Sequence, residues 1–514
     1  MSIVKQIIRN TFTGWLAVGI RGALALVIVP FLLIQLGKEG FGLIGLLGVI
    51  VSMAAIADLG LRSALGRELA EQLARNDKQA FSELASTALA LYLCMACILG
   101  LVGWMLAPWV VQVLKVSQSL QEDTVTMIRI YGTLSILFSF ITPVFSAILS
   151  SYHRFDVVNS VQIIGGILSS IVLFVVIPIV ENPLYGWIGI MLITEMTVLI
   201  LTIVFFRRCC GGAKISTHFL NRKRLVPLFH LGGYLYVIQL ANMFSSTASP
   251  LFLSIFLGPV SVALYQPASK LSAMFNPIVM TLTEQLYPLT TKFHATDNRE
   301  RLQQTFCLGA KYTLLLGSLV SACIFIFAEP LAQLWLFDSL GADYLVVAQV
   351  MQAFAILDLL AYASGTQWPI LLGMRKLEFL SILLVLTAIL SIAVSIYFVG
   401  FTSVGVVGVL YGTIIGRLIK VVLITTYVVR LVGVRMIEYI QQSIVGPAWC
   451  LFFSGMAGWA LTRNFLCNSW IELLLMVGVV SLVWGVSCWL IGLNLTERHH
   501  ILTAIKKIYQ KFFH

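Results

Sequence analysis

Long apolar runs, separated by short polar breaks, cover the chain from about residue 10 to residue 491. A helix of about 20 apolar residues crosses a bilayer, and windows of that length pick out fourteen candidate helices. They span residues 10–36, 40–61, 84–108, 124–150, 157–180, 183–206, 231–256, 260–290, 304–328, 343–372, 377–399, 403–429, 443–462 and 469–491. The pattern therefore predicts an all-α polytopic membrane protein with 14 transmembrane helices.

The polar breaks divide these helices into groups. A six-helix lobe over residues 1–206 is followed by a basic linker at 207–230 and a second six-helix lobe over residues 231–430. A helix pair lies within residues 443–491, and residues 494–514 form a basic tail. Ile501, Ile505, Ile508 and Phe512 share one helical face of that tail. We expect the tail to be an amphipathic helix at the cytoplasmic membrane surface.

The distribution of charge adds to this prediction the orientation of the helices in the membrane. Of the 514 residues, 59% are hydrophobic and 11% are charged, whereas soluble domains carry about 25% charged residues. Among the 33 lysines and arginines, 24 fall on one side of the predicted membrane, 3 on the other and 6 within helices. This asymmetry accounts for the net charge of +11 without a nucleic-acid partner. It predicts that both termini lie in the cytoplasm.

The two six-helix lobes resemble each other at an offset near 220 residues. LGKEGFGLI, starting at Leu36, aligns with LGPVSVALY, starting at Leu257. Asp77 aligns with Asp297, and the turn SYHRFD aligns with GMRKLE. Because each lobe has an even number of helices, the lobes should be related by a pseudo-twofold axis along the membrane normal. Substrate sites in such proteins lie between the repeats.

Asn10 and Trp15, the stretch VPFLLIQLGKEGFG, the segment DLGLRSALGRELA from Asp58, and the spacing Gly405–Gly408–Gly412 carry a family resemblance. The chain resembles the polysaccharide-export branch of the multidrug/oligosaccharidyl-lipid/polysaccharide (MOP) exporter superfamily, specifically the Wzx-type O-antigen flippases. The resemblance implies two lobes in a V that opens alternately to each side of the bacterial inner membrane. It implies an undecaprenyl-diphosphate-linked oligosaccharide as substrate and H⁺ or Na⁺ as coupling ion. It also implies that membrane lipids and other polysaccharide assembly proteins are partners. It also implies that the last helix pair lines a groove for the prenyl tail.

Charged residues deep inside the predicted helices are the candidate site. Arg21, Lys270 and Arg417 lie near mid-depth, and with Gln239 and Asn242 we expect them to bind the diphosphate and glycan. Arg129, Lys311 and Lys420 lie closer to helix ends, where snorkelling explains them. The acids are Glu195, Asp358 and Glu284, which either couple an ion or pair with the buried cations. Both roles stay open for them.

Asp58 and Arg62, four residues apart at the start of an amphipathic segment, are candidates for a cytoplasmic gate. Leu65, Leu69 and Leu73 share one face of this segment, so the alternative is an ordinary helix on the inner surface.

Two other functions compete with a flippase. A multidrug/cation antiporter of the same superfamily would need an acidic cavity, and the predicted interior is net basic. A polytopic membrane glycan enzyme would need a large outer loop or paired aspartates at the inner interface, and the sequence has neither. We expect no catalytic residues, no metal site and no cofactor.

Overall fold

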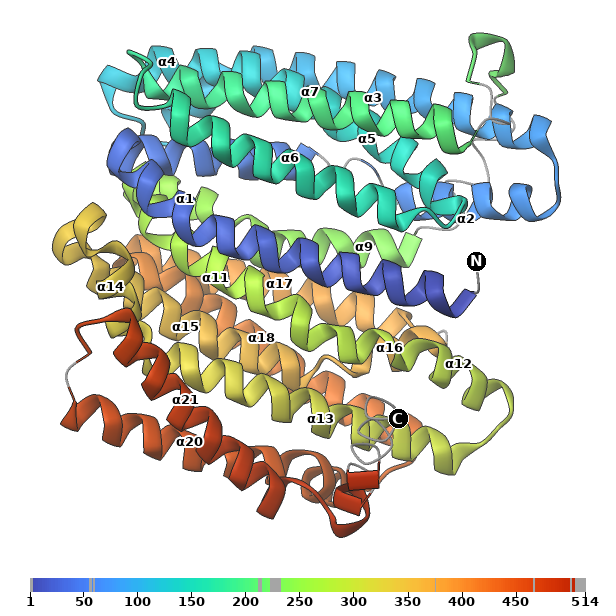
Figure 1. Ribbon diagram of the computed structural model, residues 1–514, viewed down its shortest axis with the longest axis vertical. Coiled ribbons are helices and arrows are strands. Elements are labelled where there is room, and N and C mark those ends of the chain that lie inside the picture. Colours follow the sequence, from blue (N-terminus) through green and yellow to red (C-terminus); the bar gives the residue numbers. More distant parts are fainter. Residues whose placement is uncertain are drawn as a thin grey trace, which may run out of the picture. The chain divides into compact units, whose positions relative to one another are not determined.

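The computed structural model of the protein describes residues 3–54, 58, 61–210, 215–221, 233–374, 376–465, 467–499 and 502–503 (Figure 1). These residues form helices, turns and short connections, with no strand among them. Two compact units are present. One comprises Met1–Lys270, Asp338–Leu340 and Leu384–Val409, and the other comprises Leu271–Phe337, Gly341–Leu383 and Leu410–His514.

The first unit holds the N-terminal helices. They are α1 (Ile3–Ala54), α2 (Leu61–Ala74), α3 (Lys78–Val113), α4 (Gln121–Met127), α5 (Thr133–Ser151), α6 (Phe155–Val176), α7 (Pro183–Cys209), α9 (Gly233–Asn242), α10 (Ser249–Leu257), the start of α11 (Pro259–Glu284) and the C-terminal part of α17 (Glu378–Phe401). Helix α5 packs against α2, α3 and α7, and α6 packs between α1 and α7 (Figure 1). Asn182 caps α7 through its side chain, and Pro183 occupies the first turn.

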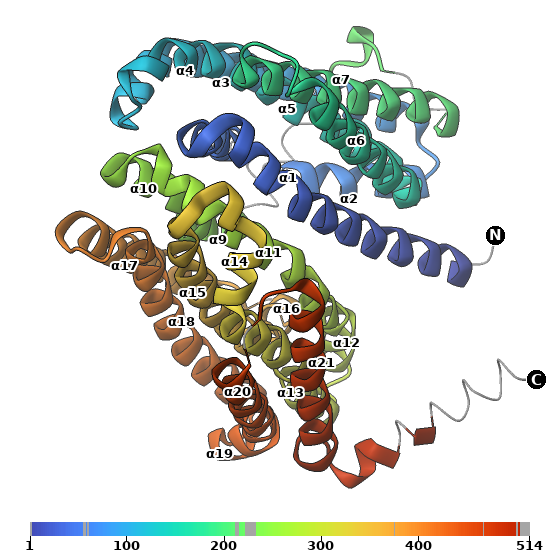
Figure 2. The ribbon, with the colours of Figure 1, turned by 60° about the vertical axis from the view of Figure 1, so that its left-hand side comes forward.

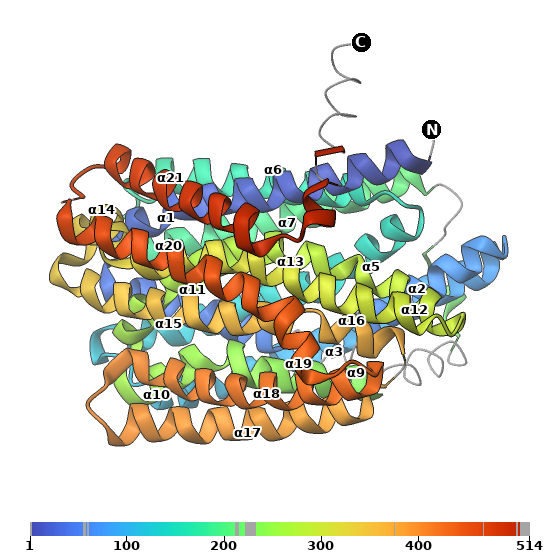
Figure 3. The same ribbon diagram turned by 90° about the horizontal axis from the view of Figure 1, so that it is seen from below.

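The second unit is built around α13 (Arg299–Ile326). Its other helices are the end of α11, α12 (Leu286–Ala295), α14 (Ala328–Leu340), α15 (Tyr344–Ala363), α16 (Gln367–Gly373), α18 (Gly408–Val432), α19 (Met436–Tyr439), α20 (Val445–Asn464) and α21 (Trp470–Ser487). Helix α13 lies beside α12, α15 and α20 (Figure 3). Helices α20 and α21 form an antiparallel pair at the end of the chain (Figure 2).

Short segments of tighter or wider helix lie at or between the ends of these elements. Single 3₁₀ turns occur at Gln118–Leu120, Thr217–Phe219, Gly341–Asp343 and Gly405–Val407. Turns of π-helix occur at Ile128–Gly132, Met243–Thr247, Ile440–Ile444 and Cys488–Gly492. Such π-turns recur at functional positions in helical proteins, and the first one directly precedes α5.

Twelve helices in the described part of the chain are long and apolar enough to cross a membrane. The sequence predicts fourteen, and two features account for the difference. Helix α1 counts once, although Gly37 interrupts it with a non-helical backbone between the first two predicted helices. Helix α11 is absent from the twelve because Gln266, Lys270 and Asn276 interrupt its apolar surface. The structure is thus a multi-span helical membrane protein, compatible with fourteen crossings.

The backbone repeats itself at an offset of 221 residues. Gly37 (φ 68°) and Gly258 (φ 85°) have the same left-handed conformation at ψ values of 175° and 171°. Asp77 caps α3 and Asn298 caps α13, each by accepting a hydrogen bond from the backbone N–H three residues later. The residue before each cap has a positive φ, 57° and 48° respectively. The internal duplication predicted from sequence is therefore present in the local geometry, but Asp77 is equivalent to Asn298 and not to Asp297, with which the sequence alignment paired it.

The beginnings of the two repeats touch each other. A Cβ added at Gly42 would lie 2.0 Å from the Pro259 carbonyl oxygen and 3.5 Å from the Ala263 nitrogen. A Cβ added at Gly45 would lie 1.1 Å from Nε2 of Gln266. Positions 42 and 263 are themselves 221 residues apart, so equivalent positions of the two repeats are in contact. Small residues permit this close backbone approach, as they do between many membrane helices.

Candidate functional site

The predicted site residues are divided between the two units. Asp58, Glu195, Gln239, Asn242 and Lys270 belong to the first unit, as do Arg21 and Arg62, whose side chains lie outside the described part of the chain. Glu284, Asp358 and Arg417 belong to the second unit.

Lys270 lies on α11, eleven residues and therefore about 17 Å from the start of that helix. Its side chain is exposed, and no hydrogen bond or ion pair connects it to another described residue. Gln239 and Asn242, one turn apart on α9, are also exposed. Glu284 is the exposed last residue of α11. A cation at this depth that has no counter-ion among the described residues is available to an anionic ligand.

Asp358 on α15 is buried, with an exposed fraction of 4%. Its carboxylate accepts hydrogen bonds from Ser272 Oγ at 2.6 Å and from Asn276 Nδ2 at 3.3 Å, both on α11. Arg417 on α18 donates from Nη1 to the Leu357 carbonyl at 3.1 Å and interacts electrostatically with Asp358. The structure therefore brings Asp358 and Arg417 together, within one network.

Sequence reasoning missed two members of this network. Ser272 and Asn276 are four residues apart on α11, so they face the same way, and this spacing is the signal that could have identified them. The arrangement matches the pairing role that the sequence left open for Asp358. Whether Arg417 also binds substrate stays a prediction.

Glu195 lies at the middle of α7, in the first unit. Its Oε1 atom accepts a hydrogen bond of 2.7 Å from Ser135 Oγ on α5, and the Tyr131 hydroxyl lies beside the same carboxyl group. Its Oε2 atom is buried and has no hydrogen-bond partner. No basic side chain in the described part of the chain forms an ion pair with it. Glu195 is therefore a half-buried acid with one hydrogen-bonded and one unpartnered carboxylate oxygen.

A cavity of about 860 Å³ opens beside Glu195, and we call it the α5 cavity. Helices α1, α2, α5, α6 and α7 all contribute to its wall. Its polar lining comprises Arg67, Ser135, Ser139, Thr142, Ser146, Ser150, Ser151, His153, Gln162, Thr194 and Glu195. Only Glu195 was singled out from sequence, because hydroxyl residues are common in apolar helices and do not by themselves indicate a cavity.

Asp58 accepts a hydrogen bond from the Tyr92 hydroxyl on α3. On the following helix α2, Leu65 and Leu69 are buried at 1% and 0% exposure, and Leu73 is half-buried. They pack on α3 and α5, as the amphipathic pattern of this segment predicts for one face. The gate role of Asp58 and Arg62 stays a prediction.

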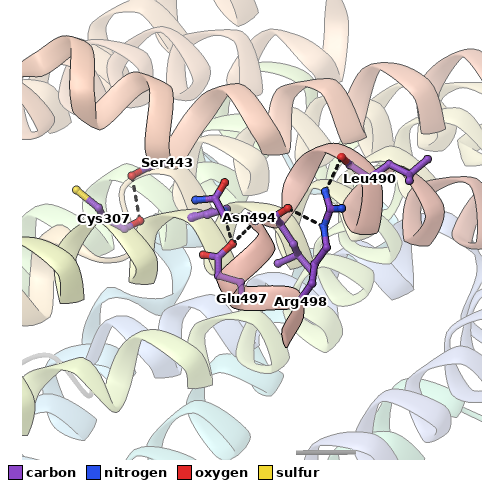
Figure 4. Close-up of polar contacts among 8 residues, drawn as sticks. Cys307, Ser443, Leu490, Asn494, Glu497 and Arg498 are labelled. Carbon is purple, nitrogen blue, oxygen red and sulfur yellow. Dashed lines mark hydrogen bonds and ion pairs between the residues drawn. The ribbon is translucent and has the colours of Figure 1, made fainter. Parts of the chain in front are cut away.

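Lys311 does not snorkel as its position near a helix end suggested. It is buried on α13 with 4% exposure, and its Nζ atom donates to Glu497 Oε2 at 2.6 Å. The Asn494 backbone N–H donates to the same oxygen at 2.7 Å (Figure 4). Arg498 donates to the Leu490 and Leu493 carbonyls at 2.8 and 3.0 Å. The segment after the last helix pair is thereby bonded to α13, an interaction that no local sequence pattern indicates.

Comparison with known proteins identifies a family. Residues 7–294 match the family described as "Polysaccharide biosynthesis protein". A curated Shigella flexneri protein named "Putative O-antigen transporter" is 24% identical over 293 residues, which cover 56% of this chain and 66% of that protein. The chain thus matches slightly under two thirds of this relative's length.

Two solved structures share the fold. The lipid II flippase MurJ, in an inward closed conformation, has a TM-score of 0.65 at 14% identity and covers 94% of this chain and 98% of its own. An inward-facing multidrug resistance MATE family transporter of the MOP superfamily has a TM-score of 0.64 at 17% identity and covers 83% of this chain and 98% of its own. These relatives are transporters and a flippase, not enzymes. With more than half of its length matched, the chain belongs to the polysaccharide biosynthesis protein family and has the fold of MOP-superfamily transporters.

Proposed function

We propose that the protein is a lipid-linked oligosaccharide flippase, which moves an undecaprenyl-diphosphate-linked glycan from the cytoplasmic to the periplasmic leaflet of the bacterial inner membrane. The observation that carries the proposal is the family match over residues 7–294. The likeness to a lipid flippase supports it, because MurJ covers 94% of this chain and the MATE transporter covers 83%. Helices α20 and α21 would be the helix pair that follows the two predicted six-helix lobes.

The charge distribution supports an anionic headgroup as cargo. Lys270 is a cation at mid-length of α11 without a partner among the described residues, and a diphosphate would supply its counter-charge. We extend this role to Arg21 and Arg417, with Gln239 and Asn242 contributing hydrogen bonds to the glycan. Alternating access of the two six-helix lobes would expose these groups to each leaflet in turn.

An ion gradient is the energy source that we infer for this cycle. Asp358 is buried and Glu195 is half-buried, they belong to different units, and acids inside membrane helices mark proton and ion pathways. Glu195 is the stronger candidate because one of its carboxylate oxygens is unpartnered, whereas Asp358 has Ser272, Asn276 and Arg417 around it.

Deletion of the protein tests the proposal. A flippase deletion should accumulate undecaprenyl-diphosphate glycan in the inner leaflet, and mass spectrometry of extracted lipids would identify the sugar. Lys270→Ala should reproduce the accumulation while the folded protein stays in the membrane. The matched control is Arg463→Ala, because Arg463 is an exposed cation beside Trp459 outside the predicted site. A deletion strain with normal lipid-linked intermediates, or a Lys270→Ala protein that restores export fully, would contradict the proposal.

A further inference from the structure

The polar wall of the α5 cavity has a helical period. Five hydroxyl residues on α5 line it at intervals of four, three, four and four residues, namely Ser135, Ser139, Thr142, Ser146 and Ser150. Such spacing places them along one face of the helix. Fifteen residues of helix span about 22 Å, so this hydroxyl track runs from mid-membrane to the end of α5.

The two ends of the track differ in chemistry. At the deep end, Ser135 donates to Glu195. At the shallow end, the track reaches His153 in the turn after α5, and Arg67 of α2 lines the cavity as well. His153 and Arg67 are both exposed, whereas Ser135 is buried at 2% exposure. The cavity therefore connects an exposed mouth to a half-buried acid, one of whose carboxylate oxygens is buried.

The wall between the ends can hold water. Pro143 lines the cavity within α5, and because proline has no N–H, the Ser139 carbonyl lacks its usual helical donor. The Ser139 hydroxyl donates its hydrogen to the Ile136 carbonyl, so the lone pairs of the Ser139 hydroxyl oxygen can accept from another donor. A buried water molecule needs two to four polar partners and about 10–15 Å³ of cavity volume. The α5 cavity, at about 860 Å³, therefore has room for a chain of water molecules.

The groups around Glu195 favour a proton over a metal ion. Its described polar neighbours are the Ser135 and Tyr131 hydroxyls, fewer oxygens than a hard cation normally requires. Among the residues described here, no group of three or more His, Cys, Asp or Glu side chains could hold a metal ion. The titratable or charged side chains around the cavity are Arg67, His153, Glu195 and the adjoining Tyr131. Hydroxyls, water and a histidine can relay protons, which favours a proton as the ion that reaches Glu195.

We propose that the α5 cavity is a one-sided proton path, which loads Glu195 from the side of His153 along the hydroxyl track of α5. The positive-inside prediction places that side in the cytoplasm. The role of this path rests on the proposed function, because an ion-coupled transporter must expose its proton site to one side of the membrane at a time.

Thiol labelling tests the path. Ser139→Cys and Ser146→Cys, made in the full chain, are expected to react with a membrane-impermeant maleimide added on the His153 side, and only there. Leu134→Cys is the matched control, because Leu134 is an exposed α5 residue that does not line the cavity, and it should stay unlabelled from both sides. Labelling is read as the increase over the wild type, which carries nine cysteines. Absence of labelling at both serine positions, or labelling from the opposite side, would refute the path.

Infrared spectroscopy of the purified protein tests whether the ion that reaches Glu195 along this path is a proton. A carbonyl band of a protonated carboxyl should be present in the wild type and missing in Glu195→Gln. Its deuterium exchange should slow in Ser146→Leu, which fills the cavity, and stay unchanged in Leu134→Phe. Loss of the Glu195 band on adding Na⁺ at constant pH would assign the site to sodium and overturn the proton proposal. Neither experiment uses a glycan, so a failure of glycan transport would count against the proposed function alone.

Discussion

The bond between Lys311 and Glu497 is the interaction whose removal we expect to matter most for stability. Glu497→Gln preserves the size of the side chain but leaves the ammonium group of the buried Lys311 without its counter-charge. Losing a neutral interhelical hydrogen bond in a membrane protein costs on average about 0.6 kcal/mol. Removing one partner of a buried ion pair costs about 3–5 kcal/mol, because an uncompensated charge remains. The second figure applies here, since the two side chains are 5% and 10% exposed.

The assay is reversible unfolding in mixed detergent–SDS micelles, followed by circular dichroism. We expect Glu497→Gln to lower the free energy of unfolding by about 3 kcal/mol or more. Adding Lys311→Met to that variant should recover part of the loss, because the unpaired charge disappears, with a coupling energy of about 0.5–3 kcal/mol. The matched control is Glu438→Gln, which breaks an exposed ion pair with Arg435 and should leave the unfolding curve in place. A loss below about 1 kcal/mol in Glu497→Gln would refute the reasoning.

Acidification should expose the same interaction. Burial alone would raise the pKa of Glu497, but hydrogen bonds from Lys311 and from the Asn494 N–H outweigh it, so the folded-state pKa is lowered. A carboxyl group with a lowered folded pKa stabilises the fold above its ordinary pKa, near 4.3. That stabilisation is lost as the pH falls from there through the folded value. Wild-type stability should therefore decline more steeply with acid than that of Glu497→Gln, and parallel pH profiles would contradict this assignment.

Two backbone predictions follow from glycine positions. Gly317→Ala would place a methyl group 2.3 Å from the buried ring of Tyr362, and should cost about 1–3 kcal/mol in the same unfolding assay, whereas Gly166→Ala meets no atom within 4 Å and should be neutral. Gly37→Ala and Gly258→Ala each force a side chain into a backbone region that almost only glycine adopts, and each should cost about 1–3 kcal/mol. Similar losses at both positions would support their equivalence in the repeat, and an unchanged unfolding curve in either would contradict the strain.

Much of the fold follows from local sequence patterns. Hydrophobic runs predict crossing helices because each helix must satisfy its own backbone in lipid. The repeat was visible in LGKEGFGLI and LGPVSVALY because a glycine with positive φ is required at the same place in each lobe. Asp77 entered only as a position of the repeat alignment, and the structure shows that it caps α3 by accepting from the N–H three residues later.

The sequence by itself determined the class of protein, the approximate crossings, the internal duplication and the family. Only the tertiary structure decided which buried charges meet. Lys311 and Glu497 are 186 residues apart, and Ser272 and Asp358 are 86 apart. Periodicity shows which residues share a face of one helix, but packing of side chains across several helices decides which faces oppose each other. For the same reason the five hydroxyls of α5 became a candidate proton path only when α1, α2, α6 and α7 enclosed a cavity beside them.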